Sequence, residues 1–269
     1  MAWTPTARSS QSTIVTDHNA IKIFHLTDPH LFADAAGELR GTNTRESLQR
    51  VLDHYQQDDW RAELAVITGD LIQDDTAEAY ENFRDALRPL GLPLACLPGN
   101  HDVRALMKAA LSAEPFSYCP TITRGNWMLV SVDSCVSGQA GGRIAAAELR
   151  RVEQLLSDSD AEHIAVFLHH PPVEMGSLWL DSVGLENADD FLALLQAHNK
   201  VRAAIFGHVH QPYDRQHGSV RVIGTPSTCR QFKEKSDTFA VDERPPAYRR
   251  LVLRPDGGID TLLMWITNA

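Results

Sequence analysis

The first two-thirds of the chain alternates short apolar runs with longer amphipathic segments. The apolar runs are rich in β-branched residues, a pattern typical of buried strands. They cover residues 21–27, 64–68, 94–97, 127–133, 164–168 and 201–206. Between most of them, apolar residues recur at helical spacing. This spacing predicts amphipathic helices over residues 43–55, 75–87, 103–111, 145–156 and 189–198.

Three of the predicted helices begin with capping signals, in which a hydrogen-bond acceptor at the helix start precedes an acid in the first turn. The pairs are Asn43 with Glu46, Asp75 with Glu78, and Asn187 with Asp190. Near the C-terminus, residues 220–223, 247–253 and 259–266 are separated by turn signals and predict strands in antiparallel pairs. Mixed signals of this kind favour an α/β (α+β) fold with two packed mixed β-sheets and helices outside.

Length and composition describe an ordinary globular chain. It has 269 residues, of which 43% are hydrophobic and 22% charged. We expect residues 18–269 to form one domain, because large α/β folds reach this size, and residues 1–17 to form a flexible tail. No apolar run approaches the roughly 20 residues of a membrane helix, and the first residues lack an apolar signal core. The chain is therefore predicted to act in the cytoplasm without a membrane partner.

Charge and cysteine usage exclude two further classes. A net charge of −10 argues against a nucleic-acid partner, because binding to the phosphate backbone needs clustered Lys and Arg. A small anion can still bind where metal ions reverse the local field. The cysteines show no C-x-x-C spacing and are predicted to be reduced thiols rather than zinc ligands. They are Cys96, Cys119, Cys135 and Cys229.

Five short polar clusters each follow one of the apolar runs. They are Asp28-Pro29-His30, Gly69-Asp70, Gly99-Asn100-His101-Asp102, His169-His170 and Gly207-His208-Val209-His210. Because ligand sites form at the carboxyl ends of strands in open α/β sheets, these clusters can converge on one crevice. Two divalent ions need about seven carboxylate, imidazole and amide donors, with one carboxylate bridging them. Each cluster alone is common in turns, but the set predicts a two-metal site.

Spacing within the clusters indicates how individual donors are used. Asp28 and His30 lie two residues apart, so their side chains share one side if the extended backbone continues between them. By the same alternation, His208 and His210 are predicted to flank the metal pair, one nitrogen to each ion. Asp70 follows a glycine at a strand end, which suits a bridging carboxylate that the backbone approaches closely.

The other two clusters predict a mixture of ligands and supporting residues. Asn100 offers a neutral amide oxygen, which is an unusual choice of ligand. His101 is predicted to protonate a leaving oxygen or to stabilise charge on the substrate, with Asp102 as its partner. Only one of two adjacent side chains faces a given side, and His169, nearer the strand, is the predicted ligand. His170 is then either a residue behind the ligand or an exposed one.

The order D-x-H, G-D, G-N-H-D, H, G-H-x-H over residues 28–210 resembles the metallophosphoesterase superfamily. Further motifs resemble the bacterial 3′,5′-cyclic-AMP phosphodiesterases and extend the similarity through Lys233. They are Leu31-Phe32, Gly41-x-Asn43-Thr44, Ser177-x-Trp179-Leu180-Asp181, Thr225-Pro226-Ser227-Thr228-Cys229 and Gln231-Phe232-Lys233. Pro29 departs from the family pattern, in which a small or hydroxylic residue is expected.

The resemblance implies a four-layer αββα sandwich with two divalent metal ions per chain, iron and/or manganese. It places Asp28, His30 and His210 on one ion, Asn100, His169 and His208 on the other, and Asp70 between them. It also implies that five residues of the site contact the substrate. These are His30, Asp70, Asn100, His101 and His210.

The activity that the resemblance implies is hydrolysis of 3′,5′-cyclic AMP to 5′-AMP by a metal-activated hydroxide, with His101 assisting the leaving group. Trp179 and Phe232, expected in loops after strand ends, can stack on adenine, although core or lid packing is the favoured interpretation. The same donors also serve a broader phosphodiesterase or phosphatase, a lipid-precursor pyrophosphatase or a phosphoprotein phosphatase. A non-catalytic scaffold on this fold is a further alternative. The oligomeric state stays open, and the remaining histidines, His25 among them, receive no role.

Overall fold

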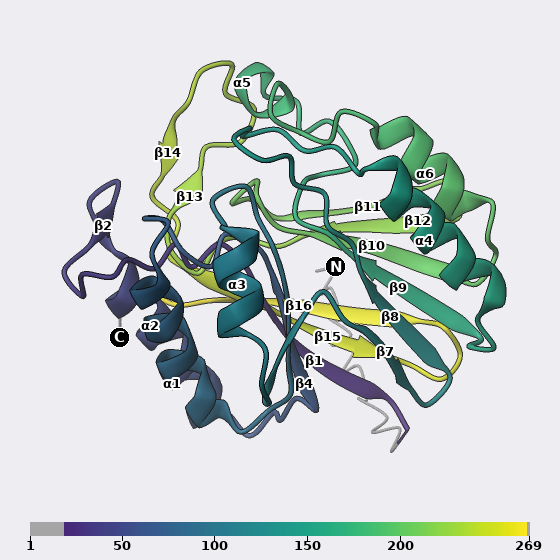
Figure 1. The fold of residues 1–269 in the computed structure, drawn as a ribbon, viewed down its shortest axis with the longest axis horizontal. Coiled ribbons are helices and arrows are strands. Elements are labelled where there is room, and N and C mark those ends of the chain that lie inside the picture. The colour runs from purple at the N-terminus through teal and green to yellow at the C-terminus, as the bar shows by residue number, and fades with distance from the viewer. Residues whose placement is uncertain (1–18, 268–269) are drawn as a thin grey trace, which may run out of the picture.

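The structure is a computed structural model that describes residues 19–267. The tail expected over residues 1–17 lies outside the described residues. Two six-stranded sheets form the body of the molecule, and helices cover their outer faces (Figure 1). Within residues 19–267, no helix combines the length and apolarity that crossing a bilayer requires.

The first sheet has the strand order β16-β15-β1-β4-β5-β6. Its strands are β1 (Ile21–Leu26), β4 (Leu64–Thr68), β5 (Leu94–Leu97), β6 (Phe116–Tyr118), β15 (Ala247–Leu253) and β16 (Ile259–Trp265). Strands β1, β4, β5 and β6 are parallel, β15 pairs antiparallel with β1, and β16 pairs antiparallel with β15. The antiparallel pairing predicted near the C-terminus is therefore confirmed for β15 and β16.

The second sheet has the strand order β11-β12-β10-β9-β8-β7. Its strands are β7 (Thr121–Arg124), β8 (Trp127–Ser131), β9 (His163–Phe167), β10 (Val201–Phe206), β11 (Tyr213–His217) and β12 (Val220–Gly224). Strand β12 pairs in parallel with β10 and antiparallel with β11. Hydrophobic periodicity missed β11 because this edge strand, YDRQH, carries polar and largely exposed side chains.

Helices α1 (Thr44–Gln57), α2 (Ala77–Leu87) and α3 (Arg104–Ala110) cover the first sheet, whereas α4 (Ala146–Asp158) and α6 (Ala188–Gln196) cover the second (Figure 1). Three apolar clusters correspond to the three interfaces of these layers. Phe83 belongs to the helix side of the first sheet, Phe167 to the space between the sheets, and Phe191 to the helix side of the second sheet. Burying each such ring stabilises the fold by roughly 1.5–3 kcal/mol. The predicted four-layer αββα sandwich is confirmed.

Short elements fill the connections. The 3₁₀ helix η1 (Arg88–Leu90) follows α2, and α5 (Leu178–Asp181) lies between β9 and α6. Two small hairpins stand outside the main sheets. One joins β2 (Glu38–Leu39) to β3 (Thr42–Asn43), and the other joins β13 (Gln231–Phe232) to β14 (Val241–Asp242).

Only one of the three capping predictions is confirmed in full. Asn43 accepts a hydrogen bond from the Glu46 amide at 2.9 Å, as predicted. At α2 the cap is Thr76, whose hydroxyl accepts from the Ala79 amide, so the prediction of Asp75 was off by one residue. Asn187 precedes α6, but its amide group bonds to the backbone of Ile144 instead of capping the helix.

Candidate metal centre

The five polar clusters converge at the carboxyl ends of β1, β4, β5, β9 and β10. The donors come from segments far apart in sequence, yet the carboxylate and imidazole donors form groups in which the ligand atoms lie within 4.8 Å of one another. The donors are Asp28, His30, Asp70, Asn100, His169, His208 and His210. The carboxylate and imidazole members are almost fully buried. The structure therefore brings together every residue that was predicted to bind metal.

The route to convergence differs from the prediction of extended backbone and alternating side chains. Five of the donors have positive φ angles between 49° and 65°, the left-handed region that non-glycine residues rarely adopt. They are Asp28, His30, Asp70, His208 and His210. Strands β1, β4 and β10 are thus each followed by a left-handed turn at the donor residues, which directs their side chains into the site. Such residues cluster at functional sites because the surrounding structure holds them there.

Close backbone packing holds these turns. The Asp28 amide donates to the Gly69 carbonyl at 3.1 Å, and the His30 amide donates to the Asp70 carbonyl at 3.0 Å. A Cβ at Gly69 would stand 2.6 Å from the Gly99 nitrogen, so only glycine permits this approach. The amide of His208 donates to the Asp28 carboxylate at 3.0 Å and fixes its orientation.

Asp28, His30 and His210 form the first donor group. The Nε2 atoms of the two histidines lie 3.2 Å apart, and Nε2 of His210 lies 3.4 Å from the Asp28 carboxylate. On its other side, His210 Nδ1 bonds to the Arg230 carbonyl, and the ring stacks flat on Phe232 at a centroid distance of 4.0 Å. A ring fixed from behind in this way presents Nε2 to the site.

His169 is at the centre of the second donor group. Its Nε2 lies 3.1 Å from Asn100 Oδ1, 3.1 Å from His208 Nδ1 and 3.4 Å from the Asp70 carboxylate. Its Nδ1 donates to the Thr68 carbonyl at 2.7 Å. Asp70 also lies 3.7 Å from His30 Nε2, so its carboxylate stands between the two groups.

This arrangement fits a pair of cations. Because Nδ1 of His169 and of His210 faces a backbone carbonyl and carries the ring proton, each Nε2 turns a lone pair toward other acceptor atoms. Buried acceptors that face one another repel unless positive charge lies between them. Burial opposes a charged His169 ring, but the Asp70 carboxylate beside it raises the pKa of His169 to about 9, so this position attracts positive charge, whether from a ring proton or from a metal ion. Imidazole, carboxylate and amide oxygen together are donors for divalent transition metals.

His101 lies beside the donors, but its partner is not the predicted one. Its Nδ1 lies 3.1 Å from the Gln73 amide nitrogen, and its backbone amide donates to Asp70 at 2.9 Å. Asp102 instead accepts from the Gly99 amide at 2.8 Å and from the Tyr80 hydroxyl at 2.9 Å. The prediction that Asp102 pairs with His101 was wrong, because its carboxylate turns inward to close the loop.

His170 is buried, which excludes the exposed alternative. Its Nδ1 lies 2.9 Å from the Ser134 hydroxyl, and its Nε2 contacts the Ala140 carbonyl at 3.2 Å. Burial lowers the pKa of His170 to about 3, so the ring is neutral. With both nitrogens engaged, its ring lies edge-on to the His169 ring at a centroid distance of 4.9 Å.

His25 is a buried histidine whose surroundings the sequence did not reveal. Its ring bonds to Thr68 Oγ1 at 3.0 Å and to Thr225 Oγ1 at 2.9 Å. The Arg249 guanidinium donates to the same Thr225 hydroxyl at 3.0 Å. A polar network thus crosses the core between the sheets and reaches Thr68, the residue that receives the His169 hydrogen bond. The only available signal was a histidine inside an apolar strand.

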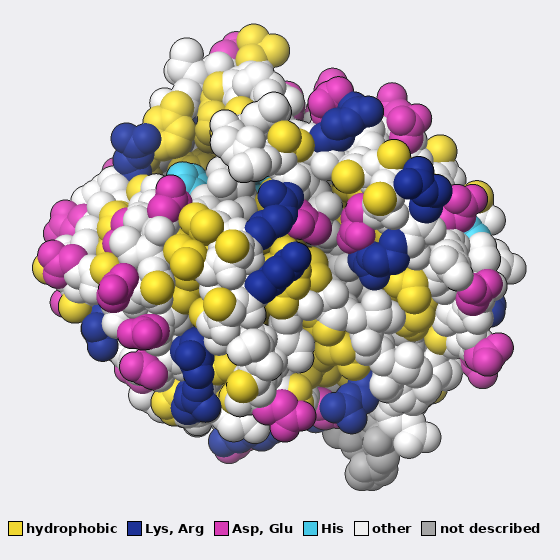
Figure 2. Space-filling view, in the orientation of Figure 1, with side chains coloured by type: hydrophobic (Ala, Val, Ile, Leu, Met, Phe, Trp, Pro, Cys, Tyr) yellow, Lys and Arg dark blue, Asp and Glu magenta, His cyan; other side chains and the backbone are white. Residues whose placement is uncertain are grey.

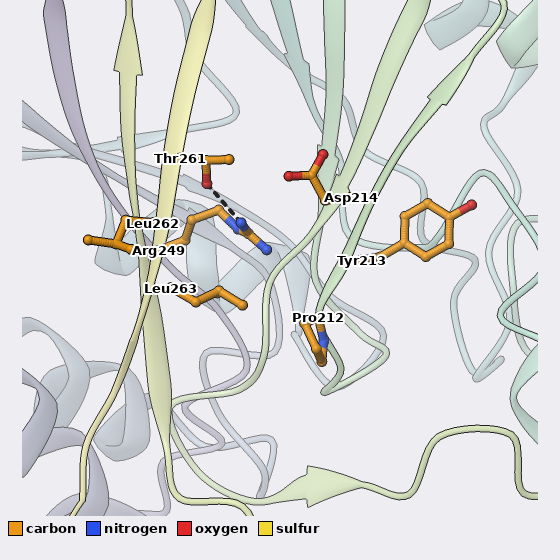
Figure 3. Close-up of a pocket in the computed structure, with 7 residues that line it drawn as sticks. All are labelled: Pro212, Tyr213, Asp214, Arg249, Thr261, Leu262 and Leu263. Carbon is orange, nitrogen blue, oxygen red and sulfur yellow. Dashed lines mark hydrogen bonds between the residues drawn. The ribbon is translucent and has the colours of Figure 1, made fainter. Parts of the chain in front are cut away.

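Two hollows of similar size open on the surface, and their chemistry distinguishes them. One, of about 370 Å³, lies where the outer strands β11 and β16 approach each other. Arg249 extends into it and bonds to Thr261 at 2.7 Å (Figure 3), but none of the groups of metal donors found among residues 19–267 lines it. The other, of about 360 Å³, lies above the donor groups and includes His101 and Gln73. In Figure 2 a histidine is visible at the bottom of a recess beneath the apolar side chains of the β13–β14 region.

Trp179 and Phe232 line the same cavity. They lie in α5 and β13 rather than in loops, with ring centroids 5.3 Å apart. The two rings pack against each other, as the favoured interpretation expected. Both also line the cavity wall, where a ligand can reach them.

The comparisons with known proteins agree with this geometry. A family model described as calcineurin-like phosphoesterase matches residues 21–212. The 3′,5′-cyclic adenosine monophosphate phosphodiesterase CpdA of Vibrio vulnificus is 36% identical over 90% of this chain and 89% of its own length. CpdA of Pseudomonas aeruginosa is 34% identical, with 93% and 91% covered.

Solved structures of low sequence identity share the fold. A dimetal phosphatase from Danio rerio superposes with a TM-score of 0.62 at 16% identity, covering 92% of this chain and 99% of that chain. GAP50, described as the anchor in the inner membrane complex of Plasmodium, superposes with a TM-score of 0.66 at 14% identity, covering 92% and 85%. Together with the matched family model and the bacterial relatives, these findings confirm that the chain belongs to the calcineurin-like phosphoesterase family.

Proposed function

We propose that this protein hydrolyses 3′,5′-cyclic AMP to 5′-AMP at the site formed by the strand ends. The observation that carries the proposal is the buried convergence of two carboxylates, four imidazoles and one amide. It is supported by relatives of 34–36% identity that are named cyclic-AMP phosphodiesterases. The cavity above the donors is open to a small ligand and combines polar and apolar walls.

We propose that two divalent cations, iron or manganese, are held by the two donor groups, one in each. One group is Asp28, His30 and His210, the other is Asn100, His169 and His208, and Asp70 is shared. When bound, such ions supply Lewis acidity and positive charge to a phosphate ester. The carbonyl contacts behind His169 and His210 orient both rings before any ion arrives, which is the usual support of metal-binding histidines.

His101 is proposed to provide the proton for the leaving group. Its ring contacts His30 edge-on at 5.1 Å, and the Gln73 amide donates to its Nδ1, which places the ring proton on Nε2. In the reaction, the oxygen of water forms a new bond to phosphorus and the bond from phosphorus to the 3′ oxygen breaks. The 3′ oxygen takes the Nε2 proton of His101 and leaves as a hydroxyl group, while the proton released by the attacking water restores the imidazole, so the product is 5′-AMP.

The test uses the purified full chain supplied with Mn²⁺. Its substrates are 3′,5′-cyclic AMP, 2′,3′-cyclic AMP, 5′-AMP and bis(p-nitrophenyl) phosphate. We expect hydrolysis of 3′,5′-cyclic AMP with 5′-AMP as the product, and loss of this activity in Asp70→Asn. Asp59→Asn, an exposed carboxylate outside the site, is the matched control. Release of phosphate from 5′-AMP without cleavage of the cyclic diester would replace the proposal with a monoester phosphatase.

The scaffold alternative has a specific precedent, because GAP50 carries the same fold and is described as an anchor. Against it stands the complete donor set of this chain, which a scaffold does not need. The chromogenic diester decides between them, since a scaffold would leave it intact under all metal conditions.

A further inference from the structure

The cavity above the donor groups has two chemically different halves. Donor side chains, His101 and Gln73 line the polar half. The other half is apolar and is lined by Leu39, Trp179, Leu180, Val183, Phe232 and Phe239. A ligand that fills both halves has a charged end and a flat or apolar end.

Three segments far apart in sequence meet on the apolar half. The four residues that they contribute are called the aromatic rim here, and they are Arg40, Trp179, Phe232 and Phe239. Arg40 comes from the β2–β3 hairpin, Trp179 from α5, and the two phenylalanines from β13 and the segment between β13 and β14. The indole meets the Phe232 ring at 5.3 Å and the Phe239 ring at 5.1 Å, both edge-on. Edge-on pairs of this kind stabilise each other by roughly 0.5–1.5 kcal/mol beyond burial.

The rim is joined directly to the donors. Phe232 stacks on the His210 ring with an angle of 6° between the planes. A ligand held by the donors therefore lies within reach of the rim. Phe239 is 42% exposed, which leaves part of its ring free for contact with a ligand.

Two polar groups of the rim are placed to contact a ligand. The Trp179 indole Nε1 is buried and makes no hydrogen bond within the described residues. An indole N–H only donates, and burying it without an acceptor is costly. The exposed Arg40 guanidinium lies 4.8 Å from the Phe239 ring centroid and forms no ion pair within residues 19–267. Both groups favour a ligand with acceptor atoms and a π face.

We propose that the rim binds the heteroaromatic base of the cyclic nucleotide, with Trp179 Nε1 donating to an acceptor of the base. This inference rests on the proposed function and deepens it. An alkyl chain would fill the apolar half but would leave the indole N–H unpaired. A base supplies ring nitrogens or carbonyl oxygens and a face for aromatic and guanidinium contacts. The rim thus selects for the base, while the donors act on the phosphodiester.

The first experiment compares kcat/KM for 3′,5′-cyclic AMP with kcat/KM for bis(p-nitrophenyl) phosphate, which has no heteroaromatic base. Trp179→Phe keeps a ring but removes the N–H, and we expect the ratio of the two values to fall about fivefold to tenfold. Trp179→Ala removes the ring as well, and the ratio should fall by roughly 10- to 100-fold. The control is Leu178→Ala, whose side chain is 70% exposed on the same short helix. An unchanged ratio in the Trp179 variants overturns the proposal.

The second experiment separates the rim from the proposed reaction. Calorimetry on the Mn²⁺-supplied protein measures the dissociation constants of 5′-AMP and ribose 5-phosphate, which differ by the base alone. We expect 5′-AMP to bind at least tenfold more tightly, and this preference to shrink in Trp179→Phe. If wild-type protein prefers 5′-AMP but does not cleave 3′,5′-cyclic AMP, the proposed function fails and the rim stands. Equal binding of the two ligands overturns the rim.

Discussion

His25 offers a quantitative test of the buried polar network between the sheets. Its two ring nitrogens bond to neutral hydroxyls, those of Thr68 and Thr225. Burial and the charge of Arg249 lower the pKa of His25 from 6.5 to about 3, with a smaller opposing effect from Asp28. The folded protein therefore keeps this ring neutral at pH values at which the unfolded chain protonates it.

The sign and size of the effect follow from this difference. The unfolded chain binds more protons than the folded one between pH 6.5 and about 3, so the free energy of unfolding falls as the pH is lowered through that range. Between pH 7 and pH 5, linkage gives a loss of about 2 kcal/mol from this histidine. Above pH 7 the ring is neutral in both states and contributes almost no pH dependence.

The assay is urea unfolding at pH 7 and pH 5 with a chelator present, so that bound metal makes no contribution. Other carboxylates and histidines titrate as well, but they are shared by wild-type protein and His25→Gln and cancel in the difference. Wild-type protein should lose about 2 kcal/mol more than His25→Gln between the two pH values. The control His198→Gln alters a half-buried histidine that follows α6 and should behave as wild type. Equal pH dependence of wild-type protein and His25→Gln would refute the reasoning.

Three further predictions concern the loop that carries His101. His101→Ala should lower kcat by about 10²- to 10⁴-fold, which is the loss typical of a general acid. Elemental analysis should find the same metal content as in wild-type protein. Loss of metal would show that His101 supports the metal centre instead. Gln73→Leu removes the amide that donates to His101 and should lower kcat with little change in KM. Gln73→Glu replaces this donor with a carboxylate, which only accepts, and should also lower kcat. Full kcat in both variants would count against a positioning role. Tyr80→Phe removes the hydroxyl that donates to Asp102 and should lower the free energy of unfolding by about 1–3 kcal/mol, as measured by urea unfolding. An unchanged free energy of unfolding would contradict the structural role of Asp102.

Placement of the donors was predictable because two simple regularities reinforce each other. Apolar runs end where strands end, and polar donors that follow parallel strands meet at one edge of a sheet. Strand β4 illustrates this, since Leu64–Thr68 was predicted with its observed bounds and Asp70 follows it. His169 was chosen over His170 by proximity to β9, and its Nε2 does face the other donors.

Side-chain partners were not predictable, because they depend on backbone conformations that no local pattern encodes. Alternation placed Asp28 and His30 on one side of an extended segment, whereas both are left-handed. Asp102 was paired with its neighbour His101 on sequence proximity alone, but the turn directs its carboxylate to Tyr80 on α2. Trp179 and Phe232 came from segments 53 positions apart, and only the fold shows that they share one wall.

The strained geometry of the site implies that metal stabilises the fold. Left-handed backbone at five donors costs of order 1 kcal/mol or more for each residue. Facing acceptors of His169, His210 and the two carboxylates add repulsion that a cation relieves. Protein stripped with a chelator should therefore unfold at lower temperature than protein with Mn²⁺, which adds about 2.7 kcal/mol at 100 times its Kd. Asp70→Asn should show a much smaller shift; an equal shift in that variant, or none in wild-type protein, would mean that the convergent donors do not bind the ion.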